Sequence, residues 1–223
     1  ASYVNRLEQY RFGTVGVPIP GVEVQIAPED GEILLRGRGI MRGYHNLDDV
    51  TSETLTDDGW LRTGDIGTID DDGFLKITDR KKALIKTSGG KYVAPQELEN
   101  KLKLLNPLIS QVVVHGDKRN FCSALVTLDE ESVQKWASDH QQQMTYEQLS
   151  RSPELSSLIQ TAVDKMNQDL PSYSTIKKFA LLPSDFTVES GELTPSMKVK
   201  RKAVEKKYMD VLDTFYGGTI EQL

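Results

Sequence analysis

The sequence holds a single cysteine among its 223 residues, so no disulfide can form within the chain. Long apolar runs are also missing: stretches such as "QVVVHG" are far shorter than the roughly 20 residues that a membrane-spanning helix needs. No secretory signal opens the chain. Its first residue is alanine, and we expect a piece of something longer. We therefore predict a cytoplasmic protein without a transmembrane segment, and leave peripheral membrane association open.

Side chains that bind metals are scarce or badly spaced. The three histidines, His45, His115 and His140, are scattered and have no cysteine partners, which excludes an ordinary zinc site. The acidic stretch "DDDG" resembles a calcium loop, but two positions do not fit. Thr68 stands two residues before Asp70, where the loop needs a carboxylate, and Asp79 stands where the twelve-residue loop ends in glutamate. We expect no metal site in this chain.

Charge is divided unevenly along the chain. Residues 1–80 hold 8 Lys and Arg against 15 Asp and Glu, whereas the remainder holds 19 against 18. No domain-wide basic surface is indicated, so a nucleic-acid partner is not expected. The change in balance suggests two regions.

The two regions differ in hydrophobic period. Residues 13–78 contain two hairpin patterns, "GVEVQIAPEDGEILLRG" and "GTIDDDGFLKITD", and predict a small, mostly antiparallel sheet. Beyond them, helical spacing in 94–105, 129–140, 152–170 and 198–216 is interleaved with strand-like runs at 111–116, 121–129 and 176–184. Cys122 lies in one of these runs and is expected in the core. The predicted fold class is α+β, with a β-rich subdomain followed by a short sheet flanked by helices.

Three short stretches carry candidate chemistry but are ambiguous when read alone. In "DGWLRTGDIG", Asp65 between two glycines suits a vicinal diol, yet Asp beside Gly is usually a turn. "SGGK" lacks the upstream glycine that a phosphate loop requires, which favours a plain glycine turn. The basic end of "ELTPSMKVKR" fits a solvated run, a nucleic-acid contact, or one lysine aimed at a phosphate.

Taken together, four stretches resemble the superfamily of adenylate-forming enzymes, and within it the bacterial long-chain fatty acyl-CoA ligases. They are "GEILLRGRGIMRGY" at 31–44, "GWLRTGDIG" at 59–67, "ITDRKKALIKTSGGKYVAPQELEN" at 77–100 and "LTPSMK" at 193–198. Their order and spacing match over nearly the whole chain. The resemblance implies an enzyme that uses ATP, with Mg²⁺, and coenzyme A (CoA) to convert a fatty acid to acyl-CoA through an acyl-adenylate.

The resemblance also assigns roles to individual residues. Asp65 and Arg80 match the contacts of the family to the ribose of the nucleotide, and Lys82 matches the hinge of a mobile C-terminal domain. Gly89, Gly90 and Lys91 match the CoA-binding loop. Lys198 matches the catalytic lysine at the α-phosphate, where an ammonium offsets charge in the transition state. Lys200, Arg201 and Lys202 are expected on a solvated face or against the partner domain.

Two departures from the family pattern matter. Met197 replaces the glycine that often precedes the catalytic lysine. The phosphate loop, adenine-binding stretch and acyl tunnel of the family are not present, so residues 1–82 are predicted as the last subdomain of a large N-terminal domain and 83–223 as the small mobile domain. Alone, the chain is expected to be inactive. A fatty acyl-AMP ligase or other adenylating enzyme, and a non-catalytic module that binds a nucleotide or a partner protein, stay open as alternatives.

Overall fold

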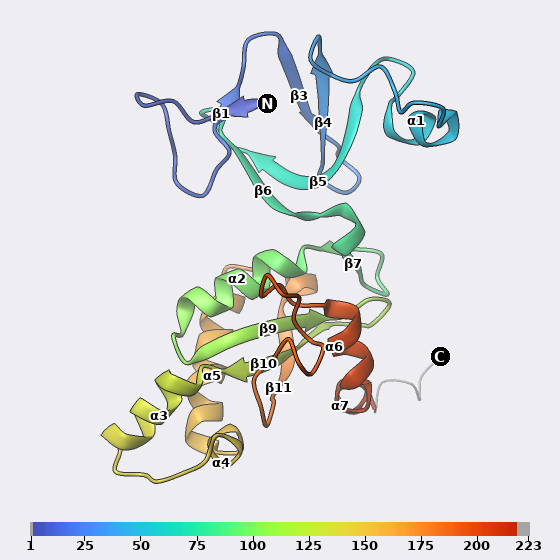
Figure 1. Ribbon diagram of the computed structural model, residues 1–223. Helices are drawn as coiled ribbons and strands as arrows, with labels where there is room; N and C mark the ends of the chain where they lie inside the picture. Colours follow the sequence, from blue (N-terminus) through green and yellow to red (C-terminus); the bar gives the residue numbers. More distant parts are fainter. Residues whose placement is uncertain (1, 218–223) are drawn as a thin grey trace. The chain divides into compact units, whose positions relative to one another are not determined.

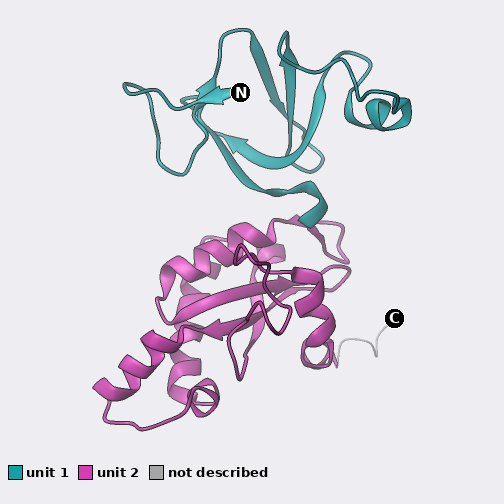
Figure 2. Cartoon of the chain, in the orientation of Figure 1, with its two compact units in different colours: residues 1–84 teal, residues 85–223 magenta. Residues whose placement is uncertain are grey.

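The structure, a computed structural model, describes residues 2–217 and separates into two compact units, Ala1–Leu84 and Ile85–Leu223 (Figure 2). Each unit has its own sheet and its own buried side chains. Residues 218–223, at the end of the predicted second domain, lie outside the described residues.

The first unit is built on an antiparallel sheet in the strand order β3-β4-β5-β6 (Figure 1). The strands are β3 (Val22–Ile26), β4 (Glu32–Gly37), β5 (Leu61–Ile69) and β6 (Leu75–Arg80). A short pair, β1 (Tyr3–Val4) and β2 (Val17–Pro18), precedes them. Both hairpins predicted from alternating apolar residues are therefore present, and Ile33, Ile66 and Leu75 are buried on this sheet.

One helix of the first unit is absent from the sequence-based expectation. It is α1 (Asp48–Thr54), and none of its seven residues is buried. Because the helix buries no apolar face, it leaves no 3.6-residue hydrophobic period to detect.

The second unit contains a three-stranded sheet with β10 (Cys122–Leu128) at its centre. Strand β9 (Ile109–His115) pairs with β10 in antiparallel fashion, and β11 (Ile176–Leu181) pairs with it in parallel. All seven residues of β10 are buried, as expected for a strand covered on both faces. Cys122 is fully buried, which confirms its place in the core, and this burial raises the pKa of its thiol to about 11.

Helices and a C-terminal segment cover the two faces of this sheet (Figure 1). The helices are α2 (Pro95–Leu105), α3 (Glu130–Asp139), α4 (Tyr146–Ser150), α5 (Pro153–Asn167), α6 (Arg201–Lys207) and α7 (Met209–Thr214), with the 3₁₀ turn η2 (Ser172–Ser174). The 3₁₀ turn η1 (Lys81–Ala83) belongs to the first unit. Leu102 and Leu155, from α2 and α5, pack with Val112 and Val126 on one face. Leu182, Leu193, Val204 and Leu212 pack with Val113 and Leu125 on the other.

The predicted helix over 198–216 is two helices that meet at Tyr208. The expected apolar face is present, since Val204 is fully buried and Tyr208, Val211 and Phe215 pack against the same cluster. The helical part begins only at Arg201, because residues 193–199 form a turn.

Arg201 was expected to face solvent or a partner domain, and that expectation is wrong. Its guanidinium lies 2.6 Å from a carboxylate oxygen of Glu99 and donates to the carbonyl of Val114 at 2.7 Å. Glu99 in turn accepts the amide of Val114 at 2.7 Å. Since β9 is an edge strand, the charged pair satisfies peptide groups that no neighbouring strand reaches.

The replacement Arg201→Ala is expected to lower the free energy of unfolding by about 2–4 kcal/mol, since it removes the cation that binds a buried carboxylate and a backbone carbonyl. Lys202→Ala, at an exposed neighbour on the same helix, is expected to change it by less than about 0.5 kcal/mol. Urea denaturation of the two variants measures both values, and equal small effects would show that Arg201 is dispensable.

Candidate functional site

A β-bulge between β4 and β5 presents Asp65. Glu32 pairs with Ile66 and Leu34 pairs with Arg62, so three residues of β5, Thr63 to Asp65, oppose one residue of β4. Bulges of this kind interrupt the ladder and redirect side chains. Gly64 has a φ of +71°, a left-handed conformation that a residue with a Cβ adopts only with strain.

The backbone groups freed by the bulge are taken up by two side chains. The hydroxyl of Thr63 donates to the carbonyl of Ile33 at 2.7 Å and accepts from the amide of Asp65 at 3.1 Å. A carboxylate oxygen of Glu32 accepts the amide of Gly64 at 2.9 Å. Each residue of the "TGD" stretch therefore has a local role: Thr63 replaces ladder bonds, Gly64 permits the turn, and Asp65 keeps a partly exposed carboxylate.

Asp65 and Arg80 lie directly opposite each other on β5 and β6. The guanidinium of Arg80 is 2.8 Å from an Asp65 carboxylate oxygen, and the side chains are 71% and 24% exposed, respectively. Exposed ion pairs contribute at most about 1 kcal/mol, so a ligand displaces such a contact at little cost. A carboxylate and a guanidinium side by side provide both acceptors and donors for a vicinal diol.

Lys81 follows Arg80 and turns back onto the sheet. Its ammonium lies 2.7 Å from Asp30 and 2.7 Å from Glu32. Hydrogen bonds to Asp30 and then to Glu32 raise the pKa of Lys81 above its ordinary value, and it stays charged at neutral pH. In contrast, the predicted hinge residue Lys82 is exposed within η1, and its side chain makes no ion pair with any described residue.

The "SGGK" loop joins two short strands, β7 (Ile85–Lys86) and β8 (Tyr92–Val93). Gly90 has a φ of +75° and donates its amide to the carbonyl of Thr87 at 2.9 Å, which is a tight turn that requires glycine. Gly89 has no such requirement, and a Cβ added there would meet no atom within 4 Å. Lys91 is exposed beside them.

Lys198 sits at the end of a tight turn. The amide of Thr194 donates to the carbonyl of Lys198 at 2.8 Å, and the hydroxyl of Thr194 accepts the amide of Lys198 at 3.0 Å. Met197, between them, has a φ of +60°. That left-handed conformation gives a physical reason why glycine suits this position. The ammonium of Lys198 is exposed and unpaired among residues 2–217.

Charged side chains fix both ends of this turn. Glu192, at its start, is 2% exposed and binds Lys207 and Ser190. Burial alone would raise the pKa of Glu192, but the hydrogen bonds from Lys207 and Ser190 outweigh it and lower the pKa. At the other end, Arg201 is held by Glu99. Lys198 therefore projects from a backbone that is anchored on both sides.

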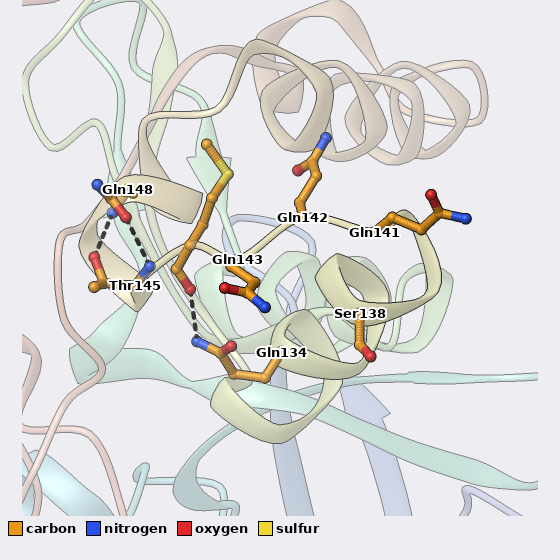
Figure 3. A pocket seen from close by; sticks show the side chains of 8 residues that line it. Gln134, Ser138, Gln141, Gln142, Gln143, Thr145 and Gln148 are labelled. Atoms are coloured by element: carbon orange, nitrogen blue, oxygen red, sulfur yellow. Dashed lines mark hydrogen bonds between the residues drawn. The ribbon is translucent and has the colours of Figure 1, made fainter.

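A pocket in the second unit is lined by none of these residues. It has a volume of about 620 Å³ and is lined by Gln134, Ser138, Gln141, Gln142, Gln143, Met144, Thr145 and Gln148 (Figure 3). Thr145 and Gln148 bond each other as a helix cap, and Gln134 donates to the carbonyl of Met144 at 3.3 Å. Its uncharged lining, from α3, α4 and the segment between them, offers no group for acid–base or phosphate chemistry.

Metal-binding clusters and membrane-spanning helices are both absent from residues 2–217. No group of three or more His, Cys, Asp or Glu side chains is arranged to hold a metal ion in that range. Within the same residues, every helix is too short or too polar to cross a membrane.

The fold matches that of part of an adenylation domain. The adenylation domain of a carboxylate reductase from Mycobacterium chelonae superposes with a TM-score of 0.66 and 26% identity, covering 94% of this chain and 33% of that one. Residues 82–219 match the model of the AMP-binding enzyme C-terminal domain. The chain belongs to this family.

Curated relatives extend the likeness to both units. The long-chain fatty acid–CoA ligase FadD15 of Mycobacterium tuberculosis is 43% identical over 216 residues, which is 96% of this chain and 36% of that protein. The long-chain fatty acid–CoA ligase ACSBG1 of Rattus norvegicus is 37% identical over 230 residues, which is 93% of this chain and 32% of that protein. The chain thus spans about a third of the length of these relatives.

The left-handed backbone at position 197 generates a stability prediction. Met197→Gly is expected to raise the free energy of unfolding by about 0.5–1 kcal/mol, because the replacement relieves strain while the lost side chain is largely exposed. Met209→Gly, at the helical start of α7, is expected to lower it by a similar amount. Denaturant midpoints of the two variants should shift in opposite directions, and a loss at both positions would rule out relieved strain at Met197.

Proposed function

We propose that this chain is the C-terminal part of a long-chain fatty acid–CoA ligase. Such an enzyme converts a fatty acid and ATP to an acyl-adenylate and pyrophosphate, and then transfers the acyl group to the thiol of CoA, releasing AMP. The observation that carries the proposal is 43% identity over 96% of the chain to a relative of that name. The adjacent Asp65 and Arg80 support it independently.

In this proposal the described side chains divide the work between the two half-reactions. Asp65 accepts hydrogen bonds from the ribose hydroxyls, and Arg80 donates to them. Lys198 brings a positive charge to the α-phosphate and the substrate carboxylate, where negative charge accumulates during adenylation. Its present lack of a partner among residues 2–217 leaves the ammonium available for that contact.

The remaining assignments concern the second half-reaction. Lys82 is proposed as the hinge, since a domain rotation must be absorbed by a few backbone dihedrals. Gly89, Gly90 and Lys91 are proposed to line the path of CoA, and the open space at Gly89 supports a close approach of a ligand. Mg²⁺ enters with ATP, since no described cluster of this chain would hold it on its own.

The function is tested with the longer protein that carries this chain. Supplied with palmitate, ATP and CoA, it is expected to form palmitoyl-CoA, AMP and pyrophosphate. Chromatography of the nucleotides and thioesters measures these products. This chain by itself is expected to show no fatty acid-dependent pyrophosphate exchange. An acyl-adenylate that forms without CoA-dependent release of AMP would indicate a ligase with another acceptor, and nucleotide binding without turnover would indicate a non-catalytic module.

For Lys198→Ala in that longer protein, acyl-adenylate formation is expected to slow on the order of 10²–10³-fold, the usual cost of one preorganised charge-stabilising contact. Thioester formation from supplied acyl-adenylate is expected to persist. Lys200→Ala, two residues away and exposed, serves as the matched control and should affect neither step. Equal losses of both half-reactions in Lys198→Ala would point to general damage to the domain instead.

A further inference from the structure

Glu32 is a buried carboxylate with two separate tasks. Its side chain is 5% exposed in the first unit. One oxygen accepts the amide of Gly64 at 2.9 Å, and the other accepts the ammonium of Lys81 at 2.7 Å. Gly64 lies in β5 and Lys81 is the first residue after β6, so a single carboxylate links the bulge of β5 to the end of β6.

The two linked residues are the immediate sequence neighbours of Asp65 and Arg80, the residues proposed to bind the ribose. Gly64 precedes Asp65, and Lys81 follows Arg80. Because Asp65 and Arg80 face each other across the two strands, their relative position depends on how the bulge and the strand end are held. Glu32 holds both points at once.

Asp30 shares only part of this arrangement. It lies 2.7 Å from the ammonium of Lys81 and accepts the amide of Glu32 at 3.0 Å, but it makes no hydrogen bond to the bulge among the described residues. The lysine between two carboxylates keeps the cluster charged, since its pKa is raised. Asp30 therefore provides a control, because its carboxylate also binds Lys81 but does not link that lysine to the bulge.

We propose that Glu32 is a positioning residue for ribose recognition, setting the separation of Asp65 and Arg80 through its contacts to Gly64 and Lys81. The inference rests on the proposed function only in its assignment of a ribose to that pair. A buried carboxylate is costly to desolvate, and its two fixed contacts offset that cost. The alternative is that Glu32 contributes to stability alone.

The variant Glu32→Gln separates these roles. A glutamine of the same shape has one acceptor oxygen and one NH₂ group, so it keeps at most one of the two contacts and faces the other donor with its own hydrogens. The bulge and the strand end are then no longer held together. The variant should therefore lose the binding affinity that Asp65 and Arg80 together gain from the ribose hydroxyls.

The experiment compares the binding of AMP and 3′-deoxy-AMP to the longer protein by calorimetry. The unmodified protein is expected to prefer AMP on the order of 10- to 100-fold, the effect of hydrogen bonds to charged groups. In Glu32→Gln this preference should fall to about threefold or less. Asp30→Asn, which leaves both contacts of Glu32 in place, should keep the preference within about twofold of the original.

A purely structural role predicts a different result. In that case Glu32→Gln weakens both nucleotides by the same factor and the preference is unchanged, which overturns the proposal. If the variant does not fold, Lys81→Met removes the second contact of Glu32 together with the ion pair of Lys81 to Asp30, whose own contribution the Asp30→Asn control measures, and an undiminished preference there has the same meaning. A parent protein without any preference overturns the ribose role of Asp65 and this proposal with it, whereas preference without acyl-CoA formation overturns only the ligase.

Discussion

Backbone amides that no neighbouring strand pairs impose the constraint on which much of this structure depends. Three buried glutamates, Glu32, Glu99 and Glu192, each accept such an amide, from Gly64, Val114 and Thr187. Each also binds a cation, which is Lys81, Arg201 or Lys207, respectively. A buried carboxylate alone would cost several kcal/mol, so the amide and the cation are needed together.

These glutamates hold the backbone from which the exposed functional side chains project. The Lys198 turn lies between Glu192 and Arg201, so both of its ends are tied to buried charges while its tip faces solvent. The Asp65 bulge is tied to Glu32 in the same manner. In each case the side chain proposed to meet the nucleotide is free of the internal network, or held only by an exposed ion pair. Reactive groups that must change partners during a reaction need this combination of fixed backbone and uncommitted side chain.

The strands of the two larger sheets and the longer helices could be predicted because their signal is local. Alternating apolar residues identified the hairpins, and leucines at helical spacing identified α2. The helix α1 was missed because it buries nothing. Arg201 was misassigned because a run of basic residues resembles a solvated face, while its partner Glu99 is 102 residues distant. The role of Glu32 was equally hidden, since it depends on a bulge and on Lys81, 49 residues away. Pairings of this length leave no periodic trace in a single sequence.

The two glycines of the "SGGK" loop look equivalent in the sequence, but the structure gives a reason for glycine at only one of them. Gly90 is required by the fold, since its left-handed turn and its bond to Thr87 account for the missing side chain. Gly89 lacks both reasons: its backbone is not left-handed, and a methyl group there would meet open space. In an ordinary loop such a position would accept many residues. A glycine that folding does not demand is better explained by something that approaches the backbone from outside the described residues. The thiol arm of CoA, which must pass close to this loop in the proposed reaction, is an occupant of that kind.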